Sequence, residues 1–289
     1  MYSGMHSRVN GLSHTGQWSL SQVISDSGYS NSSTSLGTAR EDGIESTSGS
    51  LAGVHHTPVI LPNQQFPFAG YTGPDSGVQD SPGLIYNVPA LCTQAVVNWS
   101  FGENMSTKFT AAFVATGALS AVVGAPDQSS EAAPQVRTSP CGTHVKLDDT
   151  DLMYVTTAQL TLTAGTGSAS NSDTNCSTVG FPGTLNWGLS IVQQNWAATG
   201  LGNLPTLRQD YIIALPGFND DGVFREWVLR YGKYMGFSNL AFDTSSNTPV
   251  QRTLNFAMQA NKPANHEANP AIYTPSQVIG TDSPWWGNE

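Results

Sequence analysis

The chain has 289 residues, of which only 11% are charged, and its 21 acidic and 11 basic side chains give a formal net charge of −10. Ordinary soluble domains carry about 25% charged residues, so short hydroxyl and amide side chains must keep much of this surface hydrated. The excess of acid argues against a surface for nucleic acid or anionic membrane, because both need clustered cations. The length suffices for one large β domain or for two smaller ones.

The first segment, residues 1–57, is rich in Ser, Gly and Asn and has few apolar anchors outside residues 18–24. Such a composition predicts an extended N-terminal arm. Its only basic side chains are Arg8 and Arg40, so the arm cannot neutralise much packaged RNA. Pro and Gly then recur over residues 58–89, which is typical of a segment that crosses a surface.

Later segments alternate apolar and polar side chains, which predicts β-strands. The clearest is 158–164, where Gln159, Thr161 and Thr163 separate the apolar residues. The other alternating segments are 95–101, 109–113, 185–191, 211–215, 240–242 and 254–258. Because polar, turn-rich loops separate these short strands, the sequence predicts an all-β domain over residues 58–262, either an antiparallel β-sandwich or a jelly-roll-like barrel.

One short helix is predicted at about 222–235. Asp220 or Asp221 would cap its N-terminus, and Gly236 would end it. Apolar side chains recur in between at three- and four-residue spacing, which would place them on one helical face. These residues are Phe224, Trp227 or Val228, Tyr231, and Tyr234 or Met235. Such a helix would close one end of the sandwich.

Residues 263–289 are rich in Pro and Asn and end near the pair Trp285 and Trp286. We expect an extended C-terminal tail. Two adjacent tryptophans are not expected to stay in water, so they either fold back on the domain or dock on a neighbouring molecule.

No motif for catalysis is found in its mechanistic context, so we expect no catalytic residue, no enzyme activity and no cofactor. The acidic turns Asp148 to Asp151 and Asn219 to Asp221 offer oxygen ligands of the kind that Ca²⁺ prefers. Each offers too few ligands alone, so we favour a polar turn for the first and a helix cap for the second. Adjacent His55 and His56 point apart on an extended chain, which disfavours a metal site there.

The three cysteines, Cys92, Cys141 and Cys176, are too few and too scattered for a disulfide framework. Free thiols are expected, with a single disulfide as the alternative, and the odd count fits maturation in the cytosol. The N-terminus lacks the apolar stretch of a signal peptide, and no apolar run reaches membrane-spanning length. We therefore expect neither classical secretion nor a membrane partner.

Arg225, Arg230 and Lys233 lie mostly off the apolar face of the predicted helix. Aromatic side chains at helical spacing favour core packing over a platform that stacks on sugars or nucleobases. We therefore expect these three cations to be exposed and able to pair with an acidic neighbour. With Trp285 and Trp286 they are the candidate interface residues.

Residues 213–242 contain a Leu-Pro-Gly step, an aromatic segment, and then a Gly that leads into a strand-like sequence. This order resembles part of the protruding domain of calicivirus-type capsid proteins. The residues that carry the resemblance are Leu215, Pro216, Gly217, Phe224, Trp227, Gly236, Phe237, Leu240 and Phe242. An inserted FNDDG departs from that pattern. The length, polar arm, low charge and long Ser/Thr/Gly loops also resemble capsid proteins of picorna-like viruses more broadly.

The resemblance implies a structural subunit of a non-enveloped icosahedral virion, either shell or protruding domain, assembled in the host cytoplasm. Its partners would be copies of itself, sister capsid proteins, and a host receptor or glycan. An alternative is a β-sandwich glycan-binding module, such as a phage fibre tip or adhesin, with Trp and Tyr exposed in a groove. A third hypothesis, a β-sandwich hydrolase, needs a carboxylate pair converging from separate strands.

Overall fold

A computed structural model describes much of the chain, and for some strand segments, residues 223–225 among them, it describes the backbone alone. The described residues are 5–9, 12–24, 27–29, 39–41, 45–54, 62, 65–72, 83–102, 107–124, 143–164, 167–169, 179–181, 185–195, 203–220, 223–241, 249–258 and 272–273. Predictions that concern Asp221, Cys141, Cys176, His55, His56, Trp285 and Trp286 lie outside these residues.

Every regular element among the described residues is a β-strand, which confirms the all-β prediction. The first strands are β1 (Met5–Val9), β2 (Leu12–Ile24), β3 (Ser27–Tyr29), β4 (Ala39–Glu41), β5 (Glu45–Val54) and β6 (Gln65–Thr72). Next come β7 (Leu84–Ser100), β8 (Lys108–Ala115), β9 (Ser120–Val123), β10 (Val145–Leu147), β11 (Thr150–Leu152) and β12 (Val155–Ala164). The last are β13 (Gly167–Ala169), β14 (Val179–Phe181), β15 (Leu185–Asn195), β16 (Asp210–Asp220), β17 (Val223–Ala241), β18 (Val250–Met258) and β19 (Ile272–Tyr273).

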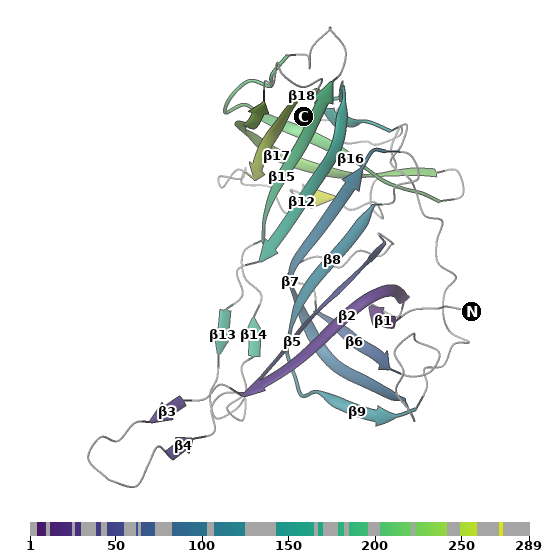
Figure 1. The fold of residues 1–289 in the computed structure, drawn as a ribbon, viewed down its shortest axis with the longest axis vertical. Helices are drawn as coiled ribbons and strands as arrows, with labels where there is room; N and C mark the ends of the chain where they lie inside the picture. The colour runs from purple at the N-terminus through teal and green to yellow at the C-terminus, as the bar shows by residue number, and fades with distance from the viewer. Residues whose placement is uncertain are drawn as a thin grey trace.

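A single antiparallel sheet of 15 strands contains all of these strands except the small pairs β3–β4 and β13–β14. In one direction its pairings run from β7 through β6, β1, β2 and β5 to β8, and β8 pairs with β7 again. In the other direction they run from β7 through β12, β15, β18, β17 and β16 to β10 and β11. The first group occupies the lower part of Figure 1 and the second the upper part. Within the described residues, no helix has the length and apolarity that crossing a membrane requires.

Strand β7 joins the two groups because it is 17 residues long and changes neighbours along its length. Its first residues pair with β6 and β9, and its last residues pair with β8 and β12. A strand shared in this way carries the core from one group into the other. The buried side chains accordingly form one cluster that includes Phe68 and Phe113 at one end and Trp187 and Phe256 at the other.

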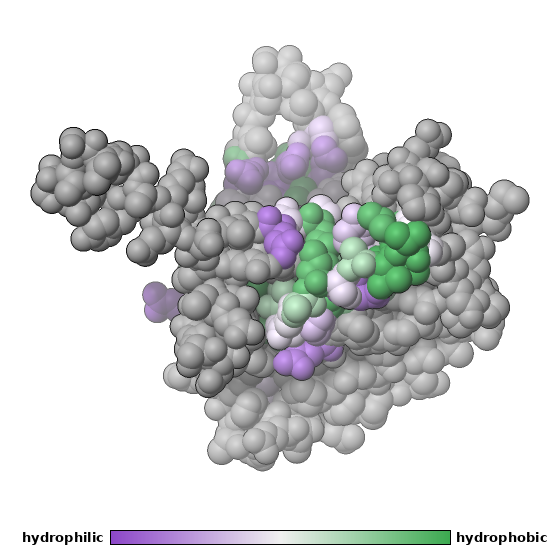
Figure 2. Space-filling view, turned by 90° about the horizontal axis from the view of Figure 1, so that it is seen from below, coloured by the Kyte–Doolittle hydropathy of each residue, from purple (hydrophilic) through white to green (hydrophobic). Residues whose placement is uncertain are grey.

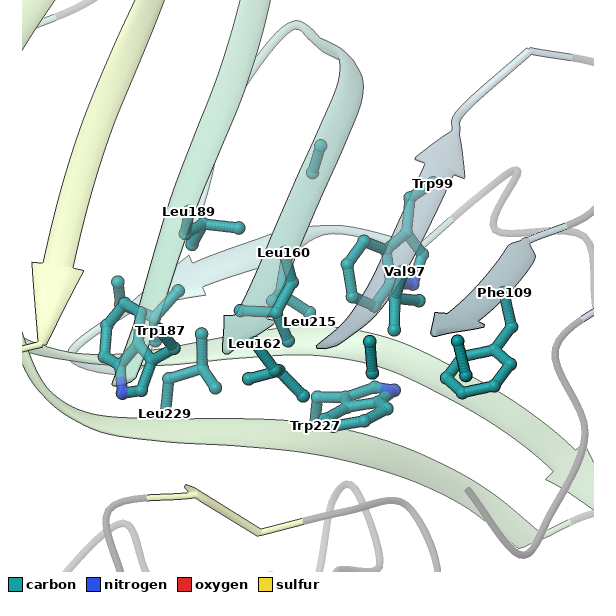
Figure 3. Close-up of a cluster of buried hydrophobic side chains, with 14 of the residues drawn as sticks. Val97, Trp99, Phe109, Leu160, Leu162, Trp187, Leu189, Leu215, Trp227 and Leu229 are labelled. Carbon is teal, nitrogen blue, oxygen red and sulfur yellow. The ribbon is translucent and has the colours of Figure 1, made fainter. Parts of the chain in front are cut away.

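The upper group folds back on itself, so that β16 and β17 pack across β7, β12 and β15 (Figure 3). The indole N–H of Trp99 on β7 donates a buried hydrogen bond to the carbonyl oxygen of Pro216 on β16, at 2.6 Å. The Trp99 ring also meets Trp227 of β17 edge-on, with ring centroids 6.5 Å apart. Because β7 and β16 are not neighbours in the sheet, these contacts join two layers and make this part sandwich-like.

The predicted strands at 95–101, 109–113, 158–164, 185–191, 211–215 and 254–258 all fall largely within observed strands. Over residues 158–164 of β12 and 187–191 of β15 the apolar side chains are buried and the residues between them are half-buried or exposed, as the alternation predicts. The period-two pattern was therefore a reliable guide to which side chains form the core.

The predicted helix at 222–235 is wrong, because residues Val223–Ala241 form strand β17. Glu226 to Arg230 are all buried, so apolar residues occupy both faces of the strand and the alternation is lost. Tyr231 then has a positive φ of 59°, which breaks the strand's regular geometry. Because β17 is buried on both faces and then becomes irregular at Tyr231, its apolar residues recur every three or four positions. This spacing resembles the apolar face of a helix.

Residues 5–9, 12–24 and 45–54 form β1, β2 and β5, which pair within the main sheet. The predicted extended arm over residues 1–57 does not include these strand pairings of β1, β2 and β5. Gly49 of β5 shows how closely the segment packs, because a Cβ there would overlap the carbonyl oxygen of Ser19 and the ring of Phe113. The division into an arm, a domain over 58–262 and a tail over 263–289 otherwise stays a prediction.

Candidate interaction surface

Four neighbouring strands, β7, β12, β15 and β18, bury one face in the core and turn the other outward. Inner positions such as Val97, Leu160, Ile191 and Leu254 are fully buried. The outer positions are half-buried or exposed and carry no charged side chain. They are Gln94, Val96, Asn98, Ser100, Thr157, Gln159, Thr161, Thr163, Asn186, Gly188, Ser190, Val192, Gln194, Gln251, Thr253, Asn255 and Ala257. We call this surface the uncharged face.

A row of polar side chains crosses the middle of the uncharged face in register. Gln159 Nε2 donates to Asn98 Oδ1 at 2.7 Å, and Ser190 Oγ donates to Asn255 Oδ1 at 3.3 Å. Asn255 Nδ2 donates in turn to Ser238 Oγ on β17, at 3.2 Å. Because these polar groups already bond to one another, covering them removes fewer hydrogen bonds to water than covering isolated amides would.

The absence of charge decides which partners suit the uncharged face. Neither a polyanion nor an ionic ligand finds a complementary charge there. Identical molecules of net charge −10 repel one another, and an uncharged contact surface keeps like charges apart when two copies meet. The uncharged face therefore fits a neutral, polar surface, including that of another copy.

A polar hydrogen-bond network and a group of exposed apolar side chains both lie near the end of the same sheet where β17 finishes and β18 begins. Arg252 of β18 donates from Nε to Gln193 Oε1 at 2.8 Å and from Nη2 to the carbonyl oxygen of Asn203 at 3.4 Å. Gln193 Nε2 donates to the carbonyl oxygen of Met153 at 2.8 Å. This network ties together β15, β18, the segment at Asn203 and the turn at Met153. Burial lowers the pKa of the Arg252 guanidinium. The exposed apolar residues on or near these segments are Met153, Tyr154, Leu204, Leu207, Met235, Phe237, Leu240 and Val250.

The structure separates the basic residues that the sequence grouped as exposed. Arg230 is only 4% exposed, which corrects the prediction of an exposed cation, and its guanidinium carbon lies 5.6 Å from the centroid of the Tyr231 ring. Lys233 is half-buried, and its backbone lies opposite Asp210 in the register of β16 and β17. The Arg225 side chain lies outside the described residues. An interface role for Arg225, Arg230, Lys233, Trp285 and Trp286 stays a prediction.

Glu226, which the sequence did not single out, is the buried carboxylate of β17. It is 3% exposed, and its Oε1 lies 4.0 Å from Lys146 Nζ. Its Oε2 has no hydrogen-bond partner among the described residues. Burial raises the pKa of the Glu226 carboxyl, while the positive charge of Lys146 opposes that rise. A single partly exposed lysine suits a structural ion pair on the β10–β16–β17 layer better than an acid–base pair for catalysis.

The acidic turn at Asp148 is structural. Its carboxylate oxygen accepts a hydrogen bond from the Ile212 N–H at 2.8 Å, and its own N–H donates to the Ile212 carbonyl at 2.9 Å. Asp148 and Asp149 have positive φ values of 46° and 64°, as a tight turn between β10 and β11 requires. Within the described ranges, no three His, Cys, Asp or Glu side chains converge as metal ligands would.

The signal for the uncharged face was present in the sequence, in the residues between the apolar ones. In the sequence, Asn98, Gln159 and Ser190 are ordinary outward positions of three separate strands. Their meaning depends on strand order, because only the pairing of β7, β12, β15 and β18 places them on one surface. The chain matches no protein-family model and no curated protein sequence.

Proposed function

We propose that the chain is a structural subunit of a non-enveloped viral capsid, in the shell or the protruding domain, which associates with copies of itself and with sister capsid proteins. We include in this proposal a jelly-roll-type sandwich as the finer form of its all-β fold. The observation that carries the proposal is the uncharged face: the outer surface of four neighbouring strands carries no charged side chain, on a chain of net charge −10, and such a surface suits contact with like molecules.

Two further features support a structural role over a catalytic one. The described polar clusters act within the fold: Asp148 holds β10 to β16, and Arg252 joins β15, β18 and the segment at Asn203. Exposed apolar residues at the β17–β18 end add surface that a neighbouring subunit would cover.

Assembly tests the proposal directly. The chain is expressed alone and together with its sister capsid proteins, its mass is measured by sedimentation, and particles are sought by negative-stain microscopy. Gln159→Lys places a charge in the middle of the uncharged face, and Gln65→Lys makes the same change at an exposed position at the start of β6, outside both the uncharged face and the exposed apolar residues at the β17–β18 end. We expect Gln159→Lys to reduce assembly and Gln65→Lys to leave it unchanged. A wild-type chain that stays monomeric beside its sister proteins, without particles, contradicts the proposal.

A glycan-binding module is the second candidate, favoured by the amide row of Asn98, Gln159 and Asn255, since amides hydrogen-bond sugar hydroxyls. Against it, Trp99, Trp187 and Trp227 are at most 3% exposed and belong to the core, so none of them forms a stacking platform. Glycan-array binding by a monomeric chain, lost in Gln159→Lys and kept in Gln65→Lys, would favour this candidate over the capsid subunit.

A further inference from the structure

Strand β9 lies at the lower end of the molecule in Figure 1 and, within the described residues, pairs with β7 alone. The pairing matches Val123 with Leu84 and Val122 with Ile85, and the Gly124 N–H extends it by donating to the Gly83 carbonyl at 3.2 Å. In an antiparallel ladder, alternate residues direct both backbone groups to the partner strand. Gly124, Val122 and Ser120 therefore face β7, and the N–H and C=O groups of Ala121 and Val123 face away from it.

The side chains of β9 leave this outer edge open to a further strand. Val122 is 56% and Val123 is 63% exposed, and both are large apolar side chains. Figure 2 looks at the molecule from this end and shows hydrophobic side chains gathered on its described surface. Natural sheets protect their edges with Lys, Pro or inward-pointing charges. Neither SAVV of β9 nor its paired segment Leu84–Asn87 contains any of these.

We propose that the outer edge of β9 pairs with β9 of a second copy of this chain, in an antiparallel, two-fold arrangement. A two-fold axis at Val122 makes Ala121 of each copy the hydrogen-bonded partner of Val123 in the other, so every outward backbone group of β9 is used. Val122 meets its own equivalent at the axis. The charge pattern favours a like copy over a charged partner, because two uncharged strands add no close repulsion to that between two chains of net charge −10.

This contact deepens the proposed function, on which it rests, because it names one edge through which copies associate. It would join the two copies' sheets edge to edge at the end opposite the exposed apolar residues of β17 and β18 (Figure 1). The uncharged face would remain free for a different neighbour. A subunit with two separate self-association surfaces can extend into an assembly larger than a dimer.

Disulfide trapping tests the predicted register in the full chain. At a non-hydrogen-bonded antiparallel pair the Cα atoms lie about 4.5 Å apart, within the range that a disulfide bridges, so Val122→Cys should give a covalent dimer under mild oxidation. In Ser120→Cys, a matched variant on the same strand, the two cysteines would lie about 13 Å apart by strand rise, and no dimer should form. Cys141 and Cys176 are replaced by Ser in both variants; Cys92 stays, because burial raises its thiol pKa to about 12 and suppresses its reactivity. Equal cross-linking of the two variants, or none in either, would overturn the register.

A second variant tests the edge itself without an oxidation step. The Val123 N–H faces away from β7, so Val123→Pro removes an outward donor and leaves the β7–β9 ladder intact. Losing one such donor in each copy should raise the dissociation constant of the dimer about tenfold, measured by sedimentation, with an unchanged circular dichroism spectrum. A dimer as tight as that of the wild type contradicts the β9 contact.

The two proposals can fail separately. If particles form and Val123→Pro and the cysteine pair behave like the wild type, the β9 contact is wrong and the capsid role stands. If Val122→Cys cross-links selectively but the chain forms no particles with its sister proteins, the β9 contact stands and the capsid role is wrong.

Discussion

The two halves of strand β17 are adjacent in sequence but lie in opposite environments. In the first half, Glu226 to Arg230 are all buried, and the strand has β16 on one side and β19 on the other. In the second half, Met235 is 60% and Phe237 is 44% exposed, and the strand there pairs with β18. A strand flanked on both edges and covered on both faces holds the core together, whereas its own continuation leaves large apolar side chains exposed.

The change between the halves has a local cause. Tyr231, Gly236 and Asn239 have positive φ values of 59°, 111° and 57°, and the pairing with β18 shifts register after Tyr234 and after Ser238. Each irregularity re-aims the following side chains. The four changes below test the contrast between the halves, from the largest expected effect to the smallest.

Trp227→Ala should destabilise the protein most, by about 3–5 kcal/mol, because a fully buried aromatic ring leaves a cavity that its neighbours fill only in part. Trp227 is 0% exposed and packs edge-on against Trp99. The measurement is urea-induced unfolding of the purified chain. Phe237→Ala removes an aromatic ring from the exposed half of the same strand and should cost far less. Comparable losses in both variants would mean that the halves do not differ as described.

Gly232→Ala should come next, with a loss of about 1–3 kcal/mol from overpacking. Gly232 sits between the two halves, and a Cβ there would lie 2.8 Å from Ile213 Cδ1, 2.9 Å from Trp187 Cη2 and 3.2 Å from the Tyr211 carbonyl oxygen. The change should lower the midpoint of thermal unfolding. Gly188→Ala is the matched control, because its added Cβ would meet only the Phe256 carbonyl oxygen at an ordinary 4.0 Å. If Gly232→Ala is as stable as Gly188→Ala, the structure around Gly232 can shift to make room for the added methyl group.

Glu226→Gln should have a smaller effect that depends on pH. A carboxyl with a raised pKa binds its proton more tightly in the folded than in the unfolded state. The wild type should therefore gain stability relative to Glu226→Gln as the pH falls through the raised pKa of Glu226, until its ordinary value of 4.5 is passed. Urea unfolding of both proteins across this pH range gives the difference in unfolding free energy. A difference that is constant with pH, or one that changes in the opposite direction, would contradict a buried Glu226.

Met235→Gln should change the unfolding free energy least, by no more than about 0.5 kcal/mol, because the side chain already lies mostly in water. If the exposed end of β17 contacts a neighbouring subunit, the same variant should weaken assembly more than it weakens the fold. Unfolding in urea and mass by sedimentation, measured on one preparation, separate these two effects.

Much of the core could be predicted from the sequence because one-sided burial leaves a visible period of two. Leu160 and Leu162 of β12 and Trp187 and Leu189 of β15 were predicted as inward positions and are buried. The same reasoning failed at Trp227, where burial on both faces removes the alternation and leaves only a spacing that also fits a helix. It also expected Arg230 to be exposed, because the length and charge of a side chain say nothing about what covers it.

The sequence by itself determined that this chain is all-β, that its strands alternate into one apolar core, and that its surface carries little charge. These properties are local, since each follows from neighbouring residues on one strand. Only the tertiary structure decided that Asn98, Gln159, Ser190 and Asn255 form one row, that β16 and β17 pack back over Trp99, and that β9 pairs with β7 alone among the described strands. Strand order and register are set by packing between residues far apart in the chain. The alternation along one strand would look the same whichever strands lay beside it, so the alternation alone cannot give the strand order.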